Sequence, residues 1–143
     1  MRAPPPVFFP GRAVGPQPVT QTARQGLGAA GERLARRYLE QQGYKFVAAN
    51  WRRAYGELDL IMRDGDVIAF VEVKTRRGER LGAAEESVSS AQARRLLLAA
   101  QSFVAERPAL ASLFWRIDLI AVTLLPSGAV SRLTHIVDAV HSD

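Results

Sequence analysis

Acidic and basic side chains gather in two short segments of this chain, Gly56–Ile61 (GELDLI) and Phe70–Arg76 (FVEVKTR). Between them lies Asp64-Gly65, a residue pair typical of the tip of a tight β-hairpin. Because side chains alternate along a strand, Glu72 and Lys74 point to the same face of such a hairpin. A hairpin would therefore bring carboxylates from both segments close to one ammonium.

The predicted register follows from a two-residue loop at Asp64-Gly65, with Arg63 facing Asp66. The predicted pairs are Leu58 with Val71, Leu60 with Ala69 and Met62 with Val67 on an apolar face, and Glu57 with Glu72 and Asp59 with Phe70 on a polar face. On that polar face Asp59 is diagonal to Glu72 and Lys74 is a near neighbour. Three carboxylates and an ammonium are thus expected at one end of one sheet face.

Such a cluster is costly unless a cation joins it. Like charges directly across a ladder repel, and partly buried carboxylates lose hydration. One ammonium cannot neutralise three acids, whereas a divalent cation can, and carboxylate oxygens suit Mg²⁺ or Mn²⁺. The alternative is that Glu57 and Glu72 lie on a solvated face and pair with nearby arginines. Because the acids come together in compatible register within apolar strands, we favour the metal site.

The composition fits a compact domain that has a hydrophobic core. The chain has 143 residues, of which 48% are hydrophobic, and no cysteine, which excludes disulfides and thiolate metal sites. Residues 1–24 hold six of the eight prolines and are predicted to be a flexible tail, with a single domain over 25–143. No apolar run approaches the roughly 20 residues that span a bilayer, so we expect a cytoplasmic protein without a membrane partner.

The charge balance suggests a polyanionic partner. The net charge is +5 and the sequence pI is about 10.4, a moderate basic surplus. Nearly all basic residues are arginines, and Lys45 and Lys74 are the only lysines. A lysine at position 74 is compatible with a need for a compact point charge there.

Periodicity predicts an α/β domain with a mixed sheet of about four to five strands in the order α-β-β-β-α-β. The predicted elements are a helix over 25–42, strands over 44–50, 57–63 and 66–75, a helix capped by Ser89 or Ser90, a strand over 115–125 and a last strand or irregular segment over 130–140. Residues 51–55 are predicted as a connection and 76–80 as the start of a mobile basic loop. The strand over 115–125 is reached through a helix and should be parallel to a hairpin strand.

Two further polar residues have less evident roles. Asp118 interrupts the apolar strand, where it could pair with a neighbour such as Arg116, pack at a strand end or join the polar site. We favour the structural alternatives. His135 has no partner at catalytic or metal-ligand spacing, which favours a structural role as well.

The motifs GELDLI, FVEVKTR and RIDLI, together with Gly31-Glu32 and Asn50-Trp51-Arg52, resemble the YraN-like family of the PD-(D/E)xK nuclease superfamily. The resemblance covers residues 25–140. The proline that gives the superfamily its name is absent, because Leu58 precedes Asp59. Many members of the superfamily also lack it, and the atoms that would bind a metal are unaffected.

The resemblance implies a restriction-endonuclease-like core and a role for each matching residue. Asp59 and Glu72 would hold Mg²⁺ or Mn²⁺, and Lys74 would orient or activate water at the scissile phosphate. Glu32 stands where resolvase-like members carry a helix glutamate that completes the metal site. Periodicity alone would make Glu32 an ordinary surface acid. Glu57 matches the family motif without an agreed catalytic role.

These observations predict a Mg²⁺-dependent, endonuclease-like hydrolase that acts on DNA, including branched or damaged DNA, as a homodimer or within a larger DNA-processing complex. The residues expected to contact the nucleic-acid backbone are Arg52, Arg53, Arg76, Arg77, Arg94 and Arg95. One alternative is a nucleic-acid-binding or recruitment module with the same fold and little turnover. Another is an interaction domain unrelated to nucleic acid, whose acids are satisfied by arginines.

Overall fold

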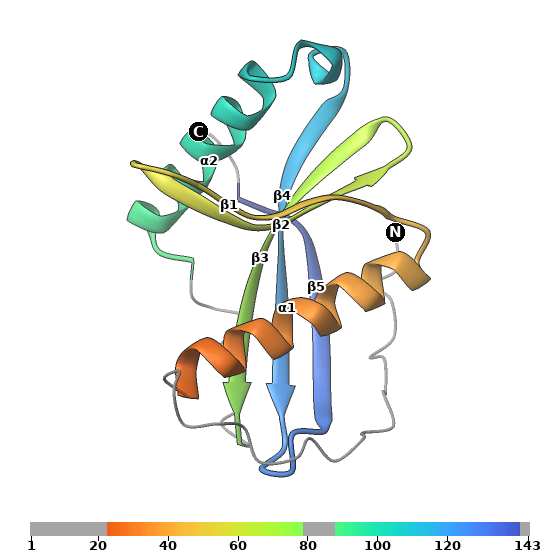
Figure 1. The fold of residues 1–143 in the computed structure, drawn as a ribbon, viewed down its shortest axis with the longest axis vertical. Helices are drawn as coiled ribbons and strands as arrows, with labels where there is room; N and C mark the ends of the chain where they lie inside the picture. Colours follow the sequence, from red (N-terminus) through yellow and green to blue (C-terminus); the bar gives the residue numbers. More distant parts are fainter. Residues whose placement is uncertain (1–22, 79–87, 141–143) are drawn as a thin grey trace.

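The computed structural model describes residues 23–78 and 88–140, which form a five-stranded sheet with a helix on each face (Figure 1). The elements are α1 (Ala23–Gln41), β1 (Lys45–Arg53), β2 (Gly56–Asp64), β3 (Val67–Arg77), α2 (Ser90–Ala105), a 3-10 turn η1 (Pro108–Leu110), β4 (Phe114–Leu124) and β5 (Val130–Val140). The strands lie side by side in chain order, β1 to β5. The α/β fold and the α-β-β-β-α-β order are as predicted, with the last segment forming a fifth strand.

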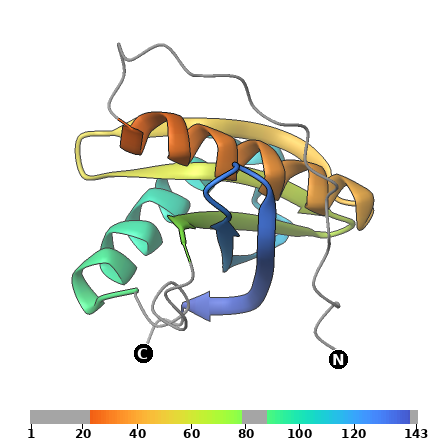
Figure 2. The same ribbon diagram turned by 90° about the horizontal axis from the view of Figure 1, so that it is seen from below.

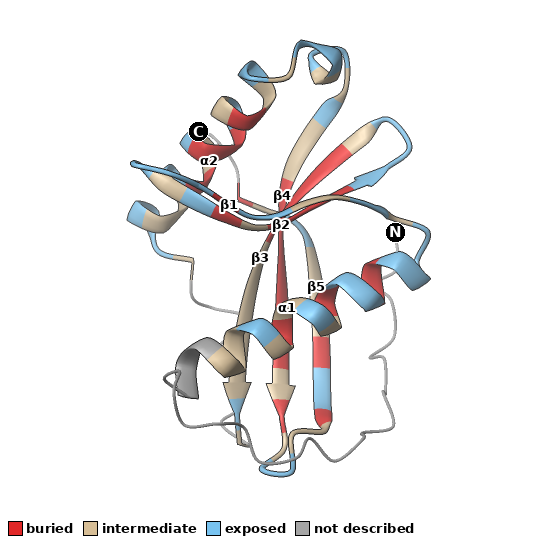
Figure 3. Cartoon of the chain, in the orientation of Figure 1, coloured by how far each residue is buried: buried red, intermediate tan, exposed pale blue. Residues whose placement is uncertain are grey.

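The sheet is mixed because α2 connects two parallel strands. β3 and β4 run parallel, as expected for strands joined through a helix, and the other neighbouring pairs are antiparallel. Figure 2 shows α1 on one side of the sheet and α2 on the other. Each helix covers its own core: α1 packs on Leu60 and Val71, and α2 packs on Phe70 and Ile117. Figure 3 shows buried residues concentrated in the strands and on the sheet-facing sides of the helices.

Local sequence explains where α1 ends and where α2 begins. After α1, Gly43 has a φ of +96°, and the Tyr44 N–H donates to the Leu39 carbonyl at 3.0 Å. This is a Schellman motif, which needs a residue without a Cβ. At the start of α2, Ser89, one of the two predicted N-cap residues, accepts from the Gln92 N–H. Within residues 23–78 and 88–140, no helix combines the length and apolar character needed to cross a membrane.

In the β2–β3 hairpin the strand pairing is shifted by two residues from the predicted register. Asp64 pairs with Val67, so the loop is Gly65-Asp66 and the prediction of an Asp64-Gly65 loop was wrong. Gly65 has a φ of +59°, the positive value that a type II′ turn requires at its first central position. A shift of two residues keeps the alternation of side chains, because the period of a strand is two, and Leu60, Met62 and Val71 share one core as predicted. Leu58 does not join them, because it packs in the other core with Ile61 and Phe70.

Strand boundaries also differ from the prediction on either side of this hairpin. Trp51 was expected in a connection but lies in β1, where its ring packs edge-on against Phe103 at 5.4 Å. Arg76 and Arg77 extend β3 rather than beginning a loop. The remainder of the predicted loop, at 79–80, lies outside the described residues, as does the predicted tail up to residue 22; α1 begins at Ala23.

Candidate active site

The two predicted metal-binding carboxylates, Asp59 and Glu72, meet where β2 and β3 part. Antiparallel pairing runs from the hairpin loop to Leu60 opposite Val71, and the same register places Asp59 opposite Glu72. Asp59 Oδ2 accepts a hydrogen bond from the Val73 backbone N–H at 3.0 Å. A side chain thus satisfies a backbone donor at this point. The predicted opposition of Asp59 to Phe70 was wrong, but the corrected register brings the two acids closer together.

Asp59 and Glu72 are hydrogen-bonded to each other through their carboxyl groups, and the pKa of each is raised. Burial, the Asp59 charge and a hydrogen bond to Asp59 raise the pKa of Glu72 to about 8. Burial also raises the pKa of Asp59, against the lowering effect of hydrogen bonds from Val73 and Glu72. The shared hydrogen bond raises one pKa and lowers the other, which places the proton on Glu72. Near pH 7 the pair therefore carries less negative charge than two carboxylates would.

Lys74 lies beside Asp59 and Glu72, but its ammonium does not form a close ion pair with Glu72. Its Nζ is 4.0 Å from Glu72 Oε1 and 3.2 Å from Gln92 Oε1 on α2. The Lys74 side chain is 27% exposed and the Glu72 side chain 13%. The ammonium is therefore accessible to a substrate while it remains adjacent to the acids.

Glu32 reaches the same region from α1. Burial and the Asp59 charge raise the pKa of Glu32, and a hydrogen bond from Asn50 partly opposes that rise. Gly31 makes this approach possible, because a Cβ at position 31 would overlap the Thr75 side chain of β3. The helix can thus lie close to the sheet, which supports the view that Glu32 belongs to the site.

The residues present fit a divalent cation in chemistry, although they do not form a closed cage. Among residues 23–78 and 88–140, no three His, Cys, Asp or Glu side chains are already grouped to hold a metal. Asp59 and Glu72 offer hard oxygen ligands, and they hold a proton where a cation could compensate their charge. Glu32 is the neighbouring carboxylate that could add a third ligand.

The predicted basic residues fall into two groups. Arg52 lies near the acids: its Nε is 3.2 Å from Glu57 Oε2 and its charge acts on Glu32. Arg94 and Arg95 are exposed in the first half of α2, which also carries Gln92, and Arg76 and Arg77 lie at the end of β3, after Lys74. Arg53 lies apart from this group. Its Nη2 pairs with Glu106 at 2.6 Å, and Glu106 follows the far end of α2, roughly 20 Å along the helix from Gln92 at the helical rise per residue.

Two residues that the structure places in the site were not among the predicted site residues. Asn50 sits between the β1 residues that pair with Leu58 and Leu60, which puts it opposite Asp59. Its φ of +52° is unusual for a residue other than glycine, and its side chain binds Glu32. Gln92 binds Lys74. The Ser89-x-x-Gln92 spacing was the available signal for Gln92, but it indicates a helix cap.

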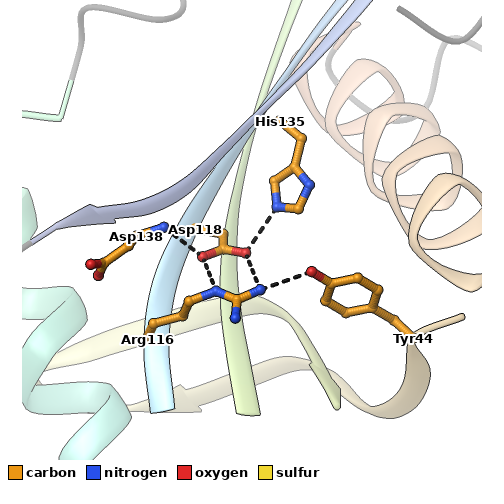
Figure 4. Close-up of polar contacts among 5 residues, drawn as sticks. All are labelled: Tyr44, Arg116, Asp118, His135 and Asp138. Atoms are coloured by element: carbon orange, nitrogen blue, oxygen red, sulfur yellow. Dashed lines mark hydrogen bonds and ion pairs between the residues drawn. The ribbon is translucent and has the colours of Figure 1, made fainter. Parts of the chain in front are cut away.

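A second buried carboxylate, Asp118 on β4, belongs to a separate network (Figure 4). Asp118 is completely buried and pairs with Arg116 Nε at 2.9 Å and His135 Nε2 at 2.8 Å, while the Asp138 backbone N–H donates to it at 2.9 Å. Arg116 also donates to the Tyr44 hydroxyl at 2.8 Å. The pairing of Asp118 with Arg116, one of the predicted alternatives, is confirmed, and His135 is its second partner.

Comparison with known proteins identifies relatives over most of the chain. The family described as "Uncharacterised protein family UPF0102" matches residues 31–122. A UPF0102 protein of Xanthomonas campestris pv. campestris is 47% identical over 121 residues, which cover 85% of this chain and 96% of the relative. A UPF0102 protein of Pelotomaculum thermopropionicum is 43% identical over 117 residues, covering 82% and 97%. The predicted resemblance to the YraN-like family, which corresponds to UPF0102, is thereby confirmed.

Proposed function

The chain belongs to the uncharacterised protein family UPF0102. We propose that it is a cytoplasmic, metal-dependent nuclease that hydrolyses phosphodiester bonds in DNA. One observation carries this proposal: Asp59 and Glu72 are held together in a largely buried position, with Lys74 beside them. Two buried acids in contact weaken the fold, because each disfavours ionisation of the other. A function that needs two adjacent carboxylates explains why such an arrangement is present.

The element order supports a place in the PD-(D/E)xK nuclease superfamily. That superfamily carries its acids on the second and third strands of an α-β-β-β-α-β core, and Asp59 and Glu72-x-Lys74 occupy those strands here. By this resemblance Asp59 and Glu72 would hold Mg²⁺ or Mn²⁺, with Glu32 as a further ligand. The cation, when bound, would lower the pKa of a water molecule and neutralise charge on the phosphate.

The protein's own side chains would divide the remaining tasks. Lys74 supplies a fixed positive charge at the position of the reacting phosphate, where preorganised electrostatics contribute most to catalysis. The Val73 N–H orients Asp59 by donating a hydrogen bond to its Oδ2. The arginines around the site, Arg52, Arg76, Arg77, Arg94 and Arg95, would bind the DNA backbone without reading sequence. The more distant Arg53 would contribute only if DNA extends along α2.

Cleavage of supercoiled, single-stranded and four-way-junction DNA in Mg²⁺ or Mn²⁺ tests this function. The wild-type protein should cut at least one of these, and Asp59→Asn and Lys74→Ala should each lower the rate by 100-fold or more, on the order of a lost electrostatic contact. Glu57→Gln is the matched control, since Glu57 lies on the same strand but is exposed. Equal rates in wild type and Asp59→Asn would contradict the proposal.

The same assay distinguishes the alternative of a recruitment module. Such a module would bind DNA with strong dependence on salt concentration and would cut none of the substrates in either metal. It would also bind equally well after Asp59→Asn. Cleavage that depends on Asp59 excludes it.

A further inference from the structure

The ammonium of Lys74 is held by a neutral partner from α2. Lys74 Nζ donates to Gln92 Oε1 at 3.2 Å, whereas Glu72 Oε1 is 4.0 Å away, beyond ordinary hydrogen-bond distance. An amide oxygen accepts the hydrogen bond without neutralising the positive charge. The contact therefore orders the lysine and leaves its charge for another group.

Gln92 departs from the role that its local sequence predicts. The spacing Ser89-x-x-Gln92 is that of a capping box, in which the glutamine side chain returns to the backbone of the capping residue. The first half of this motif is present, because the Gln92 backbone N–H donates to Ser89 Oγ at 3.1 Å. The Gln92 side-chain oxygen, however, accepts from Lys74, on a strand 18 residues earlier in the chain. A side chain that leaves its local role for a long-range polar contact is a candidate for function.

Lys74 needs such a partner more than most groups in the site. Its flexible four-carbon stem has high rotamer entropy, so the ammonium has no fixed position without a contact. Asp59, by comparison, is oriented by the Val73 N–H. The Ser89 cap fixes the backbone of Gln92, and Gln92 is half-buried, so the amide itself is well anchored.

We propose that Gln92 is a positioning residue, which holds the Lys74 ammonium beside Glu72 so that it meets a phosphate of the substrate. Its value for catalysis rests on the nuclease function proposed above. The geometric part of the inference, that Gln92 holds Lys74, is independent of that function and can be measured separately.

The chemical reactivity of Lys74 tests the geometric part. Lys45, the other lysine, is exposed and serves as an internal reference within the same molecule. With limiting sulfo-NHS-acetate and mass spectrometry, Gln92→Ala should raise the Lys74 to Lys45 acetylation ratio about 5-fold, because the amine loses its hydrogen bond. Gln92→Glu, which keeps an acceptor oxygen, should restore the wild-type ratio or lower it further.

The controls separate this effect from a general change in the helix. Gln101→Ala replaces an exposed glutamine on the same helix and should leave the ratio unchanged. Ser89→Ala should change it less than Gln92→Ala. If Gln92→Ala does not fold, as judged by its thermal transition, Gln92→Asn shortens the side chain while keeping the amide. An unchanged ratio in the folded Gln92 variants would overturn the inference.

Steady-state cleavage tests the catalytic part. Gln92→Ala should lower kcat about 10-fold with KM for DNA within 2-fold, the result expected when a group acts mainly in the transition state. Gln92→Glu should recover part of kcat, and Gln101→Ala should match wild type. An unchanged kcat for Gln92→Ala in an enzyme that cuts would refute the positioning role. If the wild-type protein cuts no DNA, the proposed function fails, while the acetylation ratio still decides whether Gln92 holds Lys74.

Discussion

Two buried carboxylate clusters lie almost side by side in this sheet, and they are built in opposite ways. Asp118 on β4 pairs in register with Val71, the residue before Glu72 on β3, so Asp118 and Glu72 point to opposite faces. Burial alone would raise the pKa of Asp118, but hydrogen bonds from His135, Arg116 and the Asp138 N–H outweigh it and hold the pKa below its usual value. For Glu72, burial and Asp59 raise the pKa to about 8.

The Asp118 cluster is neutralised by the protein itself, whereas the Glu72 cluster is suited to bind a cation. Asp118 has two basic side chains and a backbone donor within 3 Å, so its charge is fully compensated by the protein. Glu72 has one ammonium at 4.0 Å and an acid as its hydrogen-bond partner. Removing one member of a compensated buried cluster destabilises a structure, because its partners are left unpaired, whereas removing an uncompensated buried charge relieves a cost. Substitutions in the two clusters should therefore change stability with opposite sign.

The largest effect is expected at the compensated cluster. Asp118→Ala removes the carboxylate and leaves Arg116 and His135 without their shared partner in a buried position. We expect the free energy of unfolding to fall by about 3–5 kcal/mol, measured by urea denaturation at pH 7. Asp118→Asn, which keeps the shape and part of the hydrogen bonding, should cost less. A neutral effect of Asp118→Ala would remove the contrast on which the comparison rests.

Metal binding should stabilise the other cluster. Mg²⁺ or Mn²⁺ at 100 times its Kd should raise the free energy of unfolding by about 2.7 kcal/mol at pH 8. The effect should be smaller at pH 6, because a metal must displace the proton that Glu72 holds. Asp59→Asn should abolish the stabilisation, and the exposed control Glu57→Gln should retain it. Stabilisation that survives Asp59→Asn would place any metal site elsewhere.

In the absence of metal, removing the charge of Glu72 should strengthen the fold. The raised pKa means that the folded form binds a proton more tightly than the unfolded form, so stability falls as pH rises from about 4.5 to 8. Glu72→Gln cannot ionise and should lose this pH dependence, becoming more stable than wild type at pH 8 and similar to it near pH 4. Thermal or urea unfolding across this range measures it; a destabilised Glu72→Gln at pH 8 would argue against the account.

The smallest effect is expected at the exposed acid of the same sheet. Glu57 pairs with Arg52 at 3.2 Å, but their side chains are 59% and 74% exposed. Glu57→Gln should change stability by less than about 0.5 kcal/mol, with or without metal. A change as large as that for Glu72→Gln would assign Glu57 to the site and enlarge the cluster.

That Glu72 and Lys74 share a face could be predicted from the sequence, because side chains alternate along a strand, whereas the exact pairing could not. Both faces of the hairpin carry buried apolar residues, with Leu60 and Val71 under α1 and Ile61 and Phe70 under α2, so the apolar pattern alone does not fix the register. A shift of two residues preserves that alternation, so the pattern cannot choose between the loops Asp64-Gly65 and Gly65-Asp66. The turn makes the choice through the positive φ of Gly65.

The other features that the sequence did not predict are contacts between elements that are distant in the chain. The link from Gln92 to Lys74 and that from Asn50 to Glu32 depend on how the helices lie against the sheet. Local rules give these residues other roles: Gln92 fits a helix cap and Asn50 fits a turn. By contrast, the Ser89 cap depends on its own neighbours and was one of the two predicted alternatives.

Anomalous diffraction at the manganese edge, from crystals of the protein grown with Mn²⁺ near pH 8, tests the central claim most directly. The account predicts a peak bonded to carboxylate oxygens of Asp59 and Glu72, with the hydrogen bond between the two carboxyl groups lost. Diffraction that shows the two carboxyl groups still hydrogen-bonded to each other, with no peak between them at saturating Mn²⁺, would contradict it.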